Sequence, residues 1–142
     1  MSSEDLELAY EIEKECFSPD EAFSKDQYRR LLASPTVIKF KASSEGVMAG
    51  FIVGVDHNGE GEIHTVNVRT NFRRKGIATT LIQALERTFL ARGCKIVVAE
   101  ISPDNEPSKG LFKGLGYRQI RVLRDFYRRG KPAIQVEKSL AP

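Results

Sequence analysis

The residues with the clearest chemical potential form a basic loop that ends in a glycine. The run Arg73-Arg74-Lys75-Gly76-Ile77-Ala78 follows an apolar segment and opens a stretch with apolar residues at helical spacing. At a helix start, unpaired backbone amides and the positive end of the dipole together bind anions. Gly76 lets a bulky group approach the backbone, and the small Ala78 leaves room beside it. The loop therefore predicts a site for a diphosphate or a similar anion.

The composition of this loop allows one alternative and excludes two others. A short basic run is often only a solvated cluster of charges, although cations at a helix start are mildly unfavourable against the dipole. The loop lacks the glycine-lysine-hydroxyl ending of a P-loop and does not follow the GxGxxG pattern. These departures argue against nucleotide hydrolysis and against dinucleotide binding.

A carboxylate inside an apolar segment is the second feature with chemical potential. Glu100 interrupts the apolar run 96–101, where a buried carboxylate is costly unless it has a partner or a chemical role. Glu62 and His64 lie two residues apart on the same side of a predicted strand, so they can line one cleft. A structural carboxylate and a solvated Glu–His pair are the alternatives. The two histidines and two cysteines show no ligand spacing, so we expect no metal site.

The N-terminal half of the chain predicts two helices and three strands. Apolar residues recur at helical spacing near the start, with acids on the other side of the helix. Ser24 and Gln27 have the spacing of a capping box, and Pro35 ends the helix that they open. Two β-rich runs joined by a short polar turn predict a hairpin. In order, the predicted elements are helices over 3–17 and 24–32, and strands over 36–42, 47–55 and 62–68.

The C-terminal half predicts a strand–helix–strand unit and a final hairpin. The strand 62–68, a long helix over 76–92 and an apolar strand over 95–101 form a βαβ unit, whose strands are parallel. A short helix over 105–115 and a hairpin of residues 117–127 and 132–139 complete the chain. The predicted fold class is α/β, with one domain over residues 1–142 and a mixed parallel and antiparallel central sheet flanked by helices.

Composition and charge limit the classes of protein. The 142 residues are 41% apolar and 29% charged, as expected for one folded domain and not for a disordered chain. The longest apolar run, 47–55, is about half of a membrane span, and the acidic start does not have the pattern of a signal peptide. Cys16 and Cys94 form no disulfide pattern, which favours the cytoplasm. Residues 1–34 carry nine acids against four bases, and residues 109–138 carry nine bases against two acids.

Two motifs resemble those of a known enzyme family. The run from Arg73 to Ala78 matches the hallmark of the GNAT superfamily of acetyl-CoA-dependent N-acetyltransferases: Arg or Gln, two residues, Gly, one residue, Gly or Ala. Residues 105–117 (NEPSKGLFKGLGY) resemble the family's Asn-containing helix and its aromatic ending. Residues 63–68, Glu100 and the run 124–127 are further similar to bacterial ribosomal-protein alanine acetyltransferases and archaeal N-terminal acetyltransferases. The resemblance spans nearly the whole chain, and its most specific part is the RxxGxA motif.

The resemblance implies how acetyl-CoA would bind. The strand over 66–68 would pair its backbone with the pantetheine arm, and the loop from Arg73 to Thr79 would hold the pyrophosphate. Asn105 would contact the cofactor near its thiol end. Phe112 would take the position where many members place a tyrosine that protonates the leaving thiolate, although a core aromatic is an equal alternative. The residues expected to bind the cofactor are Val66, Asn67, Val68, Arg73, Arg74, Lys75, Gly76, Ile77, Ala78, Thr79, Asn105 and Phe112.

The same resemblance, together with acid–base chemistry, implies the catalytic residues. The family counterpart of Glu100 accepts a proton from the substrate amine, often through water. A free α-amine titrates near ~7.7–8.0 and a lysine near ~10.4, so an α-amine needs only modest help from a base. Phenylalanine at position 112 has no proton to give, so water, Tyr127 or Tyr117 must serve, or CoA leaves as the thiolate. The expected catalytic residues are Glu100, Tyr127 and Glu62.

The expected function is transfer of an acetyl group from acetyl-CoA to the α-amino group of a protein or peptide N-terminus. We expect direct attack without an acyl-enzyme, and ribosomal proteins are among the candidate substrates. One alternative keeps the fold and cofactor but acts on lysine side chains or a small polyamine. An alternative from another class is a basic module that binds RNA on the ribosome without catalysis. For the enzyme we expect neither a nucleic-acid nor a membrane partner.

Overall fold

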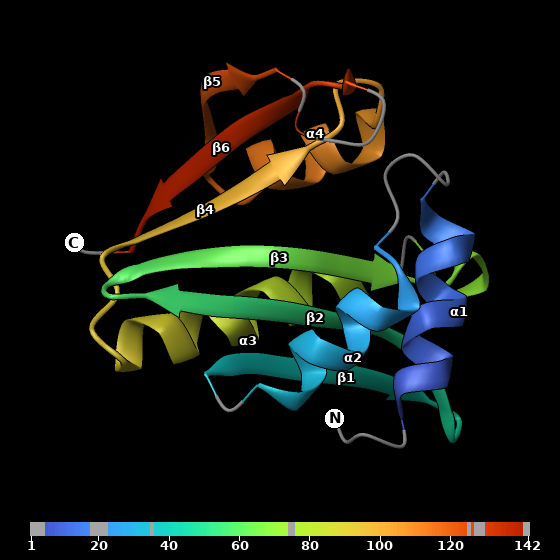
Figure 1. Ribbon diagram of the computed structural model, residues 1–142. Helices are drawn as coiled ribbons and strands as arrows, with labels where there is room; N and C mark the ends of the chain where they lie inside the picture. The colour runs from blue at the N-terminus through green and yellow to red at the C-terminus, as the bar shows by residue number, and fades with distance from the viewer. Residues whose placement is uncertain are drawn as a thin grey trace.

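The chain folds into one mixed six-stranded sheet with helices on both faces (Figure 1). The computed structural model describes residues 5–17, 23–34, 36–73, 76–124, 126 and 130–140. The strands follow the order β1-β2-β3-β4-β6-β5 across the sheet. The elements are α1 (Leu6–Cys16), α2 (Lys25–Ala33), β1 (Val37–Ser44), β2 (Val47–His57), β3 (Glu60–Val68), α3 (Ile77–Ala91), β4 (Ile96–Ile101), α4 (Glu106–Gly114), β5 (Arg118–Leu123) and β6 (Ala133–Ser139).

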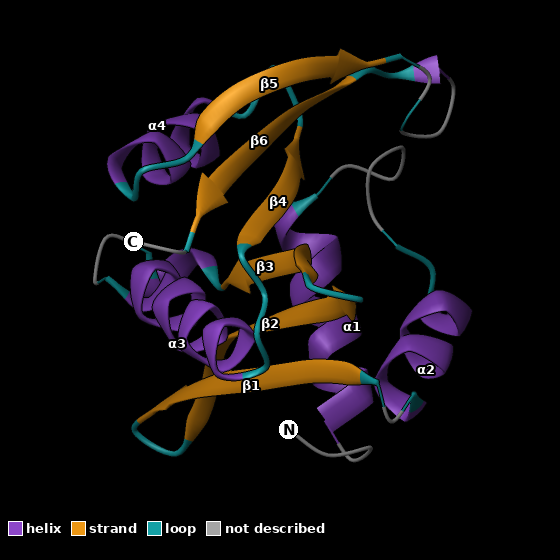
Figure 2. Ribbon diagram, turned by 90° about the vertical axis from the view of Figure 1, so that its left-hand side faces the viewer, coloured by secondary structure: helices purple, strands orange, loops and turns teal. Residues whose placement is uncertain are grey.

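The helices are divided between the two faces of the sheet. Helices α1 and α2 pack on one face of β1, β2 and β3, and α3 packs on the opposite face. Figure 2 shows α4 on the same side as α3, next to β4 and β6. Within the described residues, no helix is long and apolar enough to cross a membrane.

The elements follow the sequence pattern closely. Ser24 caps α2 through a full capping box, because its hydroxyl accepts from the Gln27 amide at 3.1 Å while the Gln27 side chain accepts from the Ser24 amide. The predicted hairpins are present as the antiparallel pairs β1–β2 and β5–β6. The predicted parallel pairing of β3 with β4 across the long helix is confirmed as well.

Strands β3 and β4 separate soon after they pair. Their parallel register runs only from Glu60, opposite Ile96, to Ile63, opposite Ala99. At this point β3 also has a bulge, since Val53 and Gly54 of β2 face Thr65 and Ile63, and His64 is the extra residue. A bulge bends its strand and changes which residues share a face. The second half of β3 therefore diverges from β4 and opens a gap in the middle of the sheet.

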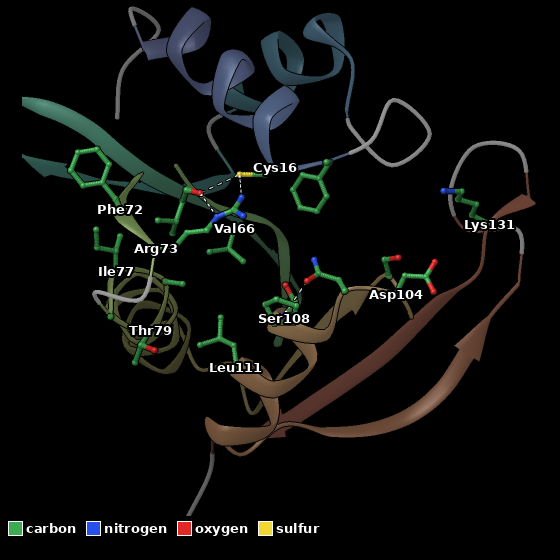
Figure 3. A pocket seen from close by; sticks show the side chains of 17 residues that line it. Cys16, Val66, Phe72, Arg73, Ile77, Thr79, Asp104, Ser108, Leu111 and Lys131 are labelled. Atoms are coloured by element: carbon green, nitrogen blue, oxygen red, sulfur yellow. Dashed lines mark hydrogen bonds between the residues drawn. The ribbon is translucent and has the colours of Figure 1, made fainter. Parts of the chain in front are cut away.

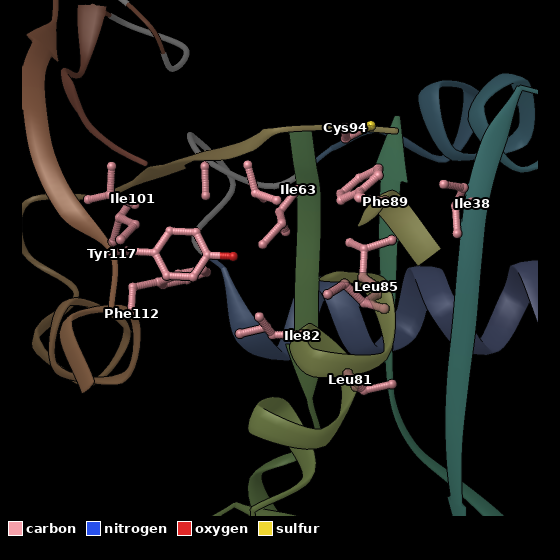
Figure 4. Close-up of a cluster of buried hydrophobic side chains, with 14 residues drawn as sticks. Ile38, Ile63, Leu81, Ile82, Leu85, Phe89, Cys94, Ile101, Phe112 and Tyr117 are labelled. Carbon is pink, nitrogen blue, oxygen red and sulfur yellow. The ribbon is translucent and has the colours of Figure 1, made fainter. Parts of the chain in front are cut away.

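Two apolar clusters hold the layers together. The larger lies between the sheet and α3 and includes Leu81, Leu85 and Phe89 (Figure 4). Gly61 belongs to this contact, because a Cβ added there would lie 2.6 Å from the Phe89 ring. The smaller cluster lies on the opposite face, where α1 and α2 pack on β2, and is centred on the fully buried Tyr28.

Candidate active site

The gap between β3 and β4 opens into a cavity of about 910 Å³ beside the start of α3 (Figure 3). Strand β3, the loop before α3, the first turn of α3, and α4 supply most of its wall. The residues predicted to bind the cofactor that line it are Val66, Val68, Arg73, Gly76, Ile77, Ala78, Thr79 and Asn105. Arg74 and Lys75 lie outside the described residues. The sequence motif and the strand before it thus meet at one cavity.

The start of α3 has the form of an anion-binding helix end. Gly76 is the N-cap residue, with φ +77° and no side chain to cap the helix. Its carbonyl accepts from the Thr80 amide at 3.0 Å, so the amides of residues 77–79 precede the first turn's bonds. Apart from its chain neighbours, no described residue has an atom within 4 Å of a Cβ added at Gly76, so this part of the backbone is open to a ligand. These features fit the diphosphate of coenzyme A.

Arg73 brings a positive charge to the edge of this cavity. Its Nε donates to the Val68 carbonyl at 3.2 Å, and an Nη donates to the Cys16 sulfur at 3.4 Å. The Cys16 thiol itself donates to the Val68 carbonyl at 3.3 Å, and Figure 3 shows the Cys16 sulfur beside the Arg73 guanidinium. Burial raises the pKa of the Cys16 thiol, so this cysteine is not an activated nucleophile.

The diverging half of β3 presents its residues alternately to the cavity and away from it. Val66 and Val68 line the cavity. The Asn67 side chain lies on the opposite face, 1% exposed, and donates to Glu13 Oε1 at 3.1 Å and to Thr65 Oγ1 at 3.0 Å. Asn67 can therefore contact a cofactor in this cavity through its backbone and not through its side chain.

A second cavity of about 280 Å³ adjoins the first. The two cavities share five lining residues: Phe17, Val66, Ser102, Asn105 and Ser108. Glu62, His64 and Glu100 line only the smaller one. A ligand group held in the large cavity is thus adjacent to a compartment lined by three carboxylates, since Glu13 lines it as well, and by one imidazole.

Glu100 lies half-buried on β4 in this smaller cavity. Gln135 of β6 donates from Nε2 to Glu100 Oε2 at 3.0 Å and orients the carboxylate. Burial raises the pKa of Glu100, and the nearby charge of Glu62 raises it further, against the lowering by the Gln135 hydrogen bond. A carboxylate whose pKa moves toward neutrality is better matched to proton abstraction than an ordinary one.

Glu62 has the opposite electrostatic environment. Its Oε1 lies 3.5 Å from His64 Nδ1 and 3.5 Å from His57 Nε2. The hydrogen bond with His64 lowers the pKa of Glu62, and this effect outweighs the rise due to burial. Environments that move the pKa values of two neighbouring carboxyl groups apart suit them for different roles. These shifts make Glu100 the more basic of the two carboxylates and favour the ionised form of Glu62 beside the imidazole.

Phe112, at the expected position of the acid, and the two tyrosine candidates for proton transfer have different positions. Phe112 is 3% exposed in the apolar cluster, where its ring lies 5.0 Å from Tyr117, and it also lines the smaller cavity (Figure 4). Tyr117 donates its hydroxyl to Glu86 Oε2 of α3 at 2.7 Å and lines neither cavity, so it is not available as the acid. Tyr127 lies outside the described residues.

The sequence analysis did not single out Glu13, which is fully buried in α1 and lines the smaller cavity. Its Oε1 accepts from the Tyr28 hydroxyl at 2.5 Å and from Asn67, and its Oε2 accepts from the Phe23 amide at 3.0 Å. Burial raises the pKa of Glu13. The signal was its position beside Ile12, four residues after Ala9, on the buried stripe of the helix.

Comparison with known proteins identifies the family of this fold and site. The model of the acetyltransferase (GNAT) family matches residues 6–117. The chain belongs to the GNAT family. The predicted family and its mixed α/β fold are thus confirmed. Solved structures similar to this chain hold coenzyme A, and the chain is an acetyltransferase that uses acetyl-CoA. This replaces the alternative of an RNA-binding module without catalysis.

The chain is similar to individual acetyltransferases in sequence and in fold. The chain is 29% identical over 129 residues to the N-alpha-acetyltransferase RimI of Mycobacterium tuberculosis, which covers 87% of this chain and 79% of that protein. Its fold matches the ribosomal-protein-S18-alanine N-acetyltransferase of Escherichia coli with a TM-score of 0.88 at 20% identity, over 100% of this chain and 92% of the other. It matches Ard1 of Thermoplasma volcanium with a TM-score of 0.89 at 22% identity, over 100% of this chain and 95% of the other.

Among the described residues, no group of three or more His, Cys, Asp or Glu side chains is arranged to hold a metal ion.

Proposed function

We propose that this GNAT enzyme, as one catalytic domain over residues 1–142, acetylates the α-amino group of a protein or peptide N-terminus. The observation that carries the proposal is Glu100 in a small cavity that shares its wall with the cofactor cavity. The name of the M. tuberculosis relative, an N-alpha-acetyltransferase, supports the same substrate class. Ribosomal proteins are candidate substrates, by analogy with the E. coli enzyme of similar fold.

In this proposal, acetyl-CoA binds in the larger cavity. The amides of residues 77–79 and the charge of Arg73 hold the diphosphate, and Arg74, Lys75 and Gly76 complete that loop. The backbone of Val66, Asn67 and Val68 holds the pantetheine arm, and Asn105 lies near the thiol end. When bound, acetyl-CoA supplies a thioester whose carbonyl carbon accepts the amine nitrogen.

The catalytic roles concern one proton at each end of the reaction. Glu100 takes the proton from the substrate ammonium, directly or through one water, so that a neutral amine attacks and no acyl-enzyme forms. Glu62 orients the cationic form of the amine beside it. Phe112 has no proton to give, so the proton that the departing thiolate takes comes from water or from Tyr127.

The pKa of the acceptor ammonium group distinguishes an α-amine from a lysine side chain as substrate. An α-amine titrates near ~7.7–8.0 and a lysine near ~10.4, so deprotonating the lysine costs about 3 kcal/mol more at neutral pH. A single carboxylate base in a small cavity suits the deprotonation of an α-amine, which costs less.

The free thiols Cys16 and Cys94 suit the reducing cytoplasm, where we place the enzyme.

The experiment compares three acceptors with acetyl-CoA: a peptide with a free α-amine, the same peptide with a blocked N-terminus and one lysine, and a linear polyamine. We expect the highest kcat/KM for the free α-amine, and the rate should fall in the Glu100→Gln variant. A higher kcat/KM for the blocked lysine peptide or the polyamine would overturn the proposal in favour of that substrate.

A further inference from the structure

One face of the C-terminal half of the sheet carries no helix within the described residues. Helices α1 and α2 lie over β1, β2 and β3, and α4 packs on the opposite face of β4 and β6 (Figures 1 and 2). The helix-free face of β4, β6 and β5, called the open face below, begins at the smaller cavity, because Glu100 belongs to both. Any substrate longer than the cavity must leave it somewhere, and the open face lies directly beside it.

The other sides of the cavity are lined by side chains of the described chain, among them the exposed Phe126. Phe17 and Phe23 form its wall on the side of α1 and α2, where the Phe23 ring stacks on His64 at 4.7 Å. Phe112 closes the side toward the apolar cluster. The larger cavity is assigned to the cofactor. Among the described residues, the open face is the side of this cavity that carries no helix, so it offers a route for a polypeptide substrate.

The strand register fixes which residues stand on this route. Glu100 is the partner of Gln135, and Gln135 is the partner of Arg121, so the three lie in one row across β4, β6 and β5. Ile134 and Val136, the neighbours of Gln135 on β6, pack in the apolar cluster on the α3 side. Gln135 and its hydrogen-bond partner Glu100 therefore lie on the open face. Antiparallel partners share a face, so Arg121 stands on it too.

A comparison with the next row shows that Arg121, unlike Arg118, has no acidic residue as its cross-strand partner. There Arg118 is paired with its cross-strand partner Glu137 at 3.1 Å, so opposite charges balance. Arg121, in contrast, is exposed and faces the uncharged amide of Gln135. Arg124, just beyond the end of β5, is exposed as well. The outer end of the row that starts at Glu100 is thus positive.

We propose that the open face binds the substrate polypeptide just after its acetylated residue, and that Arg121 binds an acidic side chain there. The inference rests on the proposed acetylation of N-termini and adds a sequence preference to it. Two spacings of about 4.8 Å between strands separate the Cα atoms of Glu100 and Arg121 by about 10 Å. An extended peptide covers that distance in about three residues. With the first residue at Glu100, the fourth lies at Arg121.

The test uses a peptide series with a free N-terminus and acetyl-CoA at low ionic strength. The peptides are identical except for Glu, Gln or Lys at residue 4, and a further control has Gln at residue 4 and Glu at residue 8. The enzymes are the wild type, Arg121→Glu and the matched control Arg87→Glu, which makes the same charge change at an exposed position of α3. Thermal unfolding of each variant verifies that it is folded.

For the wild type we expect kcat/KM about three- to fivefold higher with Glu than with Gln at residue 4, and a smaller ratio at high salt. Arg121→Glu should reverse the order in favour of Lys, whereas Arg87→Glu and the peptide with Glu at residue 8 should show no such effect. Equal kcat/KM for the Glu and Gln peptides with the wild type would overturn the inference and leave N-terminal acetylation standing. If no peptide is acetylated at its α-amine while a lysine or polyamine is, the proposed function fails, and this inference fails with it.

Discussion

Replacing Gly76 by alanine separates the effect of backbone strain from the effect on cofactor binding. At φ +77°, an alanine costs about 1–2 kcal/mol in the left-handed region. Apart from its chain neighbours, no described residue has an atom within 4 Å of the added Cβ, so the cost to the free protein that the described residues indicate is backbone strain. For a chain of this size we expect the melting temperature to fall by about 3–8 °C.

The effect on acetyl-CoA is larger and has another cause. The added methyl group stands in the opening through which a diphosphate reaches the amides of α3. The loss of one charge-assisted hydrogen bond costs about 1.5–3 kcal/mol, which raises the Kd for acetyl-CoA by about 10- to 150-fold.

Gly46 provides a matched control for this substitution. It has φ +80°, no atom within 4 Å of an added Cβ, and a place in the β1–β2 turn, outside the residues that line either cavity. Calorimetric titration with acetyl-CoA and thermal unfolding of both alanine variants form the assay. Both variants should lose similar stability, and only Gly76→Ala should lose affinity. Equal affinities in the two variants would refute the assignment of the α3 start as the diphosphate site.

Three further predictions concern the smaller cavity. Glu100→Gln should lower kcat by about 100-fold near neutral pH and by less at high pH, with unchanged acetyl-CoA affinity. Because the pKa of Glu100 is raised, the rate of the wild-type enzyme should rise at a higher pH than an ordinary carboxyl group would give. A Glu100→Gln variant with the wild-type pH–rate profile would show that Glu100 is not the base. Glu13→Ala should lower the free energy of unfolding by about 3 kcal/mol in urea titrations, since it leaves buried donors without their acceptor, whereas Glu11→Ala on the exposed face of α1 should change it by less than about 0.5 kcal/mol. Phe112→Tyr should keep or raise kcat, and a fall of tenfold or more in steady-state assays would show that a hydroxyl is not tolerated at this position.

Local sequence signals were sufficient for most of the fold. The Ser24–Gln27 spacing set the start of α2, and Gly76 set the start of α3, because caps depend on residues next to each other in the chain. The strand–helix–strand pattern required parallel pairing of β3 with β4. The basic loop likewise predicted its own cavity, since the motif contains both the glycine and the helix start.

Features that depend on distant contacts could not be predicted in the same way. The bulge at His64 cannot be recognised from the alternation of apolar and polar residues in β3. It nevertheless determines that the Asn67 side chain lies on the face of the sheet that packs against α1. The burial of Glu13 depends on donors from α2 and β3, far away in sequence. Tyr117 was a candidate acid from its residue type alone, and its bond to Glu86 became visible only when α3 and the end of α4 were brought together.

The most direct test of the central claim uses one peptide that carries a free α-amine and one internal lysine. After incubation with acetyl-CoA at neutral pH, tandem mass spectrometry locates the acetyl group, and the thiol released is counted in the same reaction. We expect one acetyl group on the α-nitrogen for each thiol released, and a rate that falls about 100-fold in Glu100→Gln. Acetylation of the lysine instead, or an unchanged rate in Glu100→Gln, would contradict the central claim.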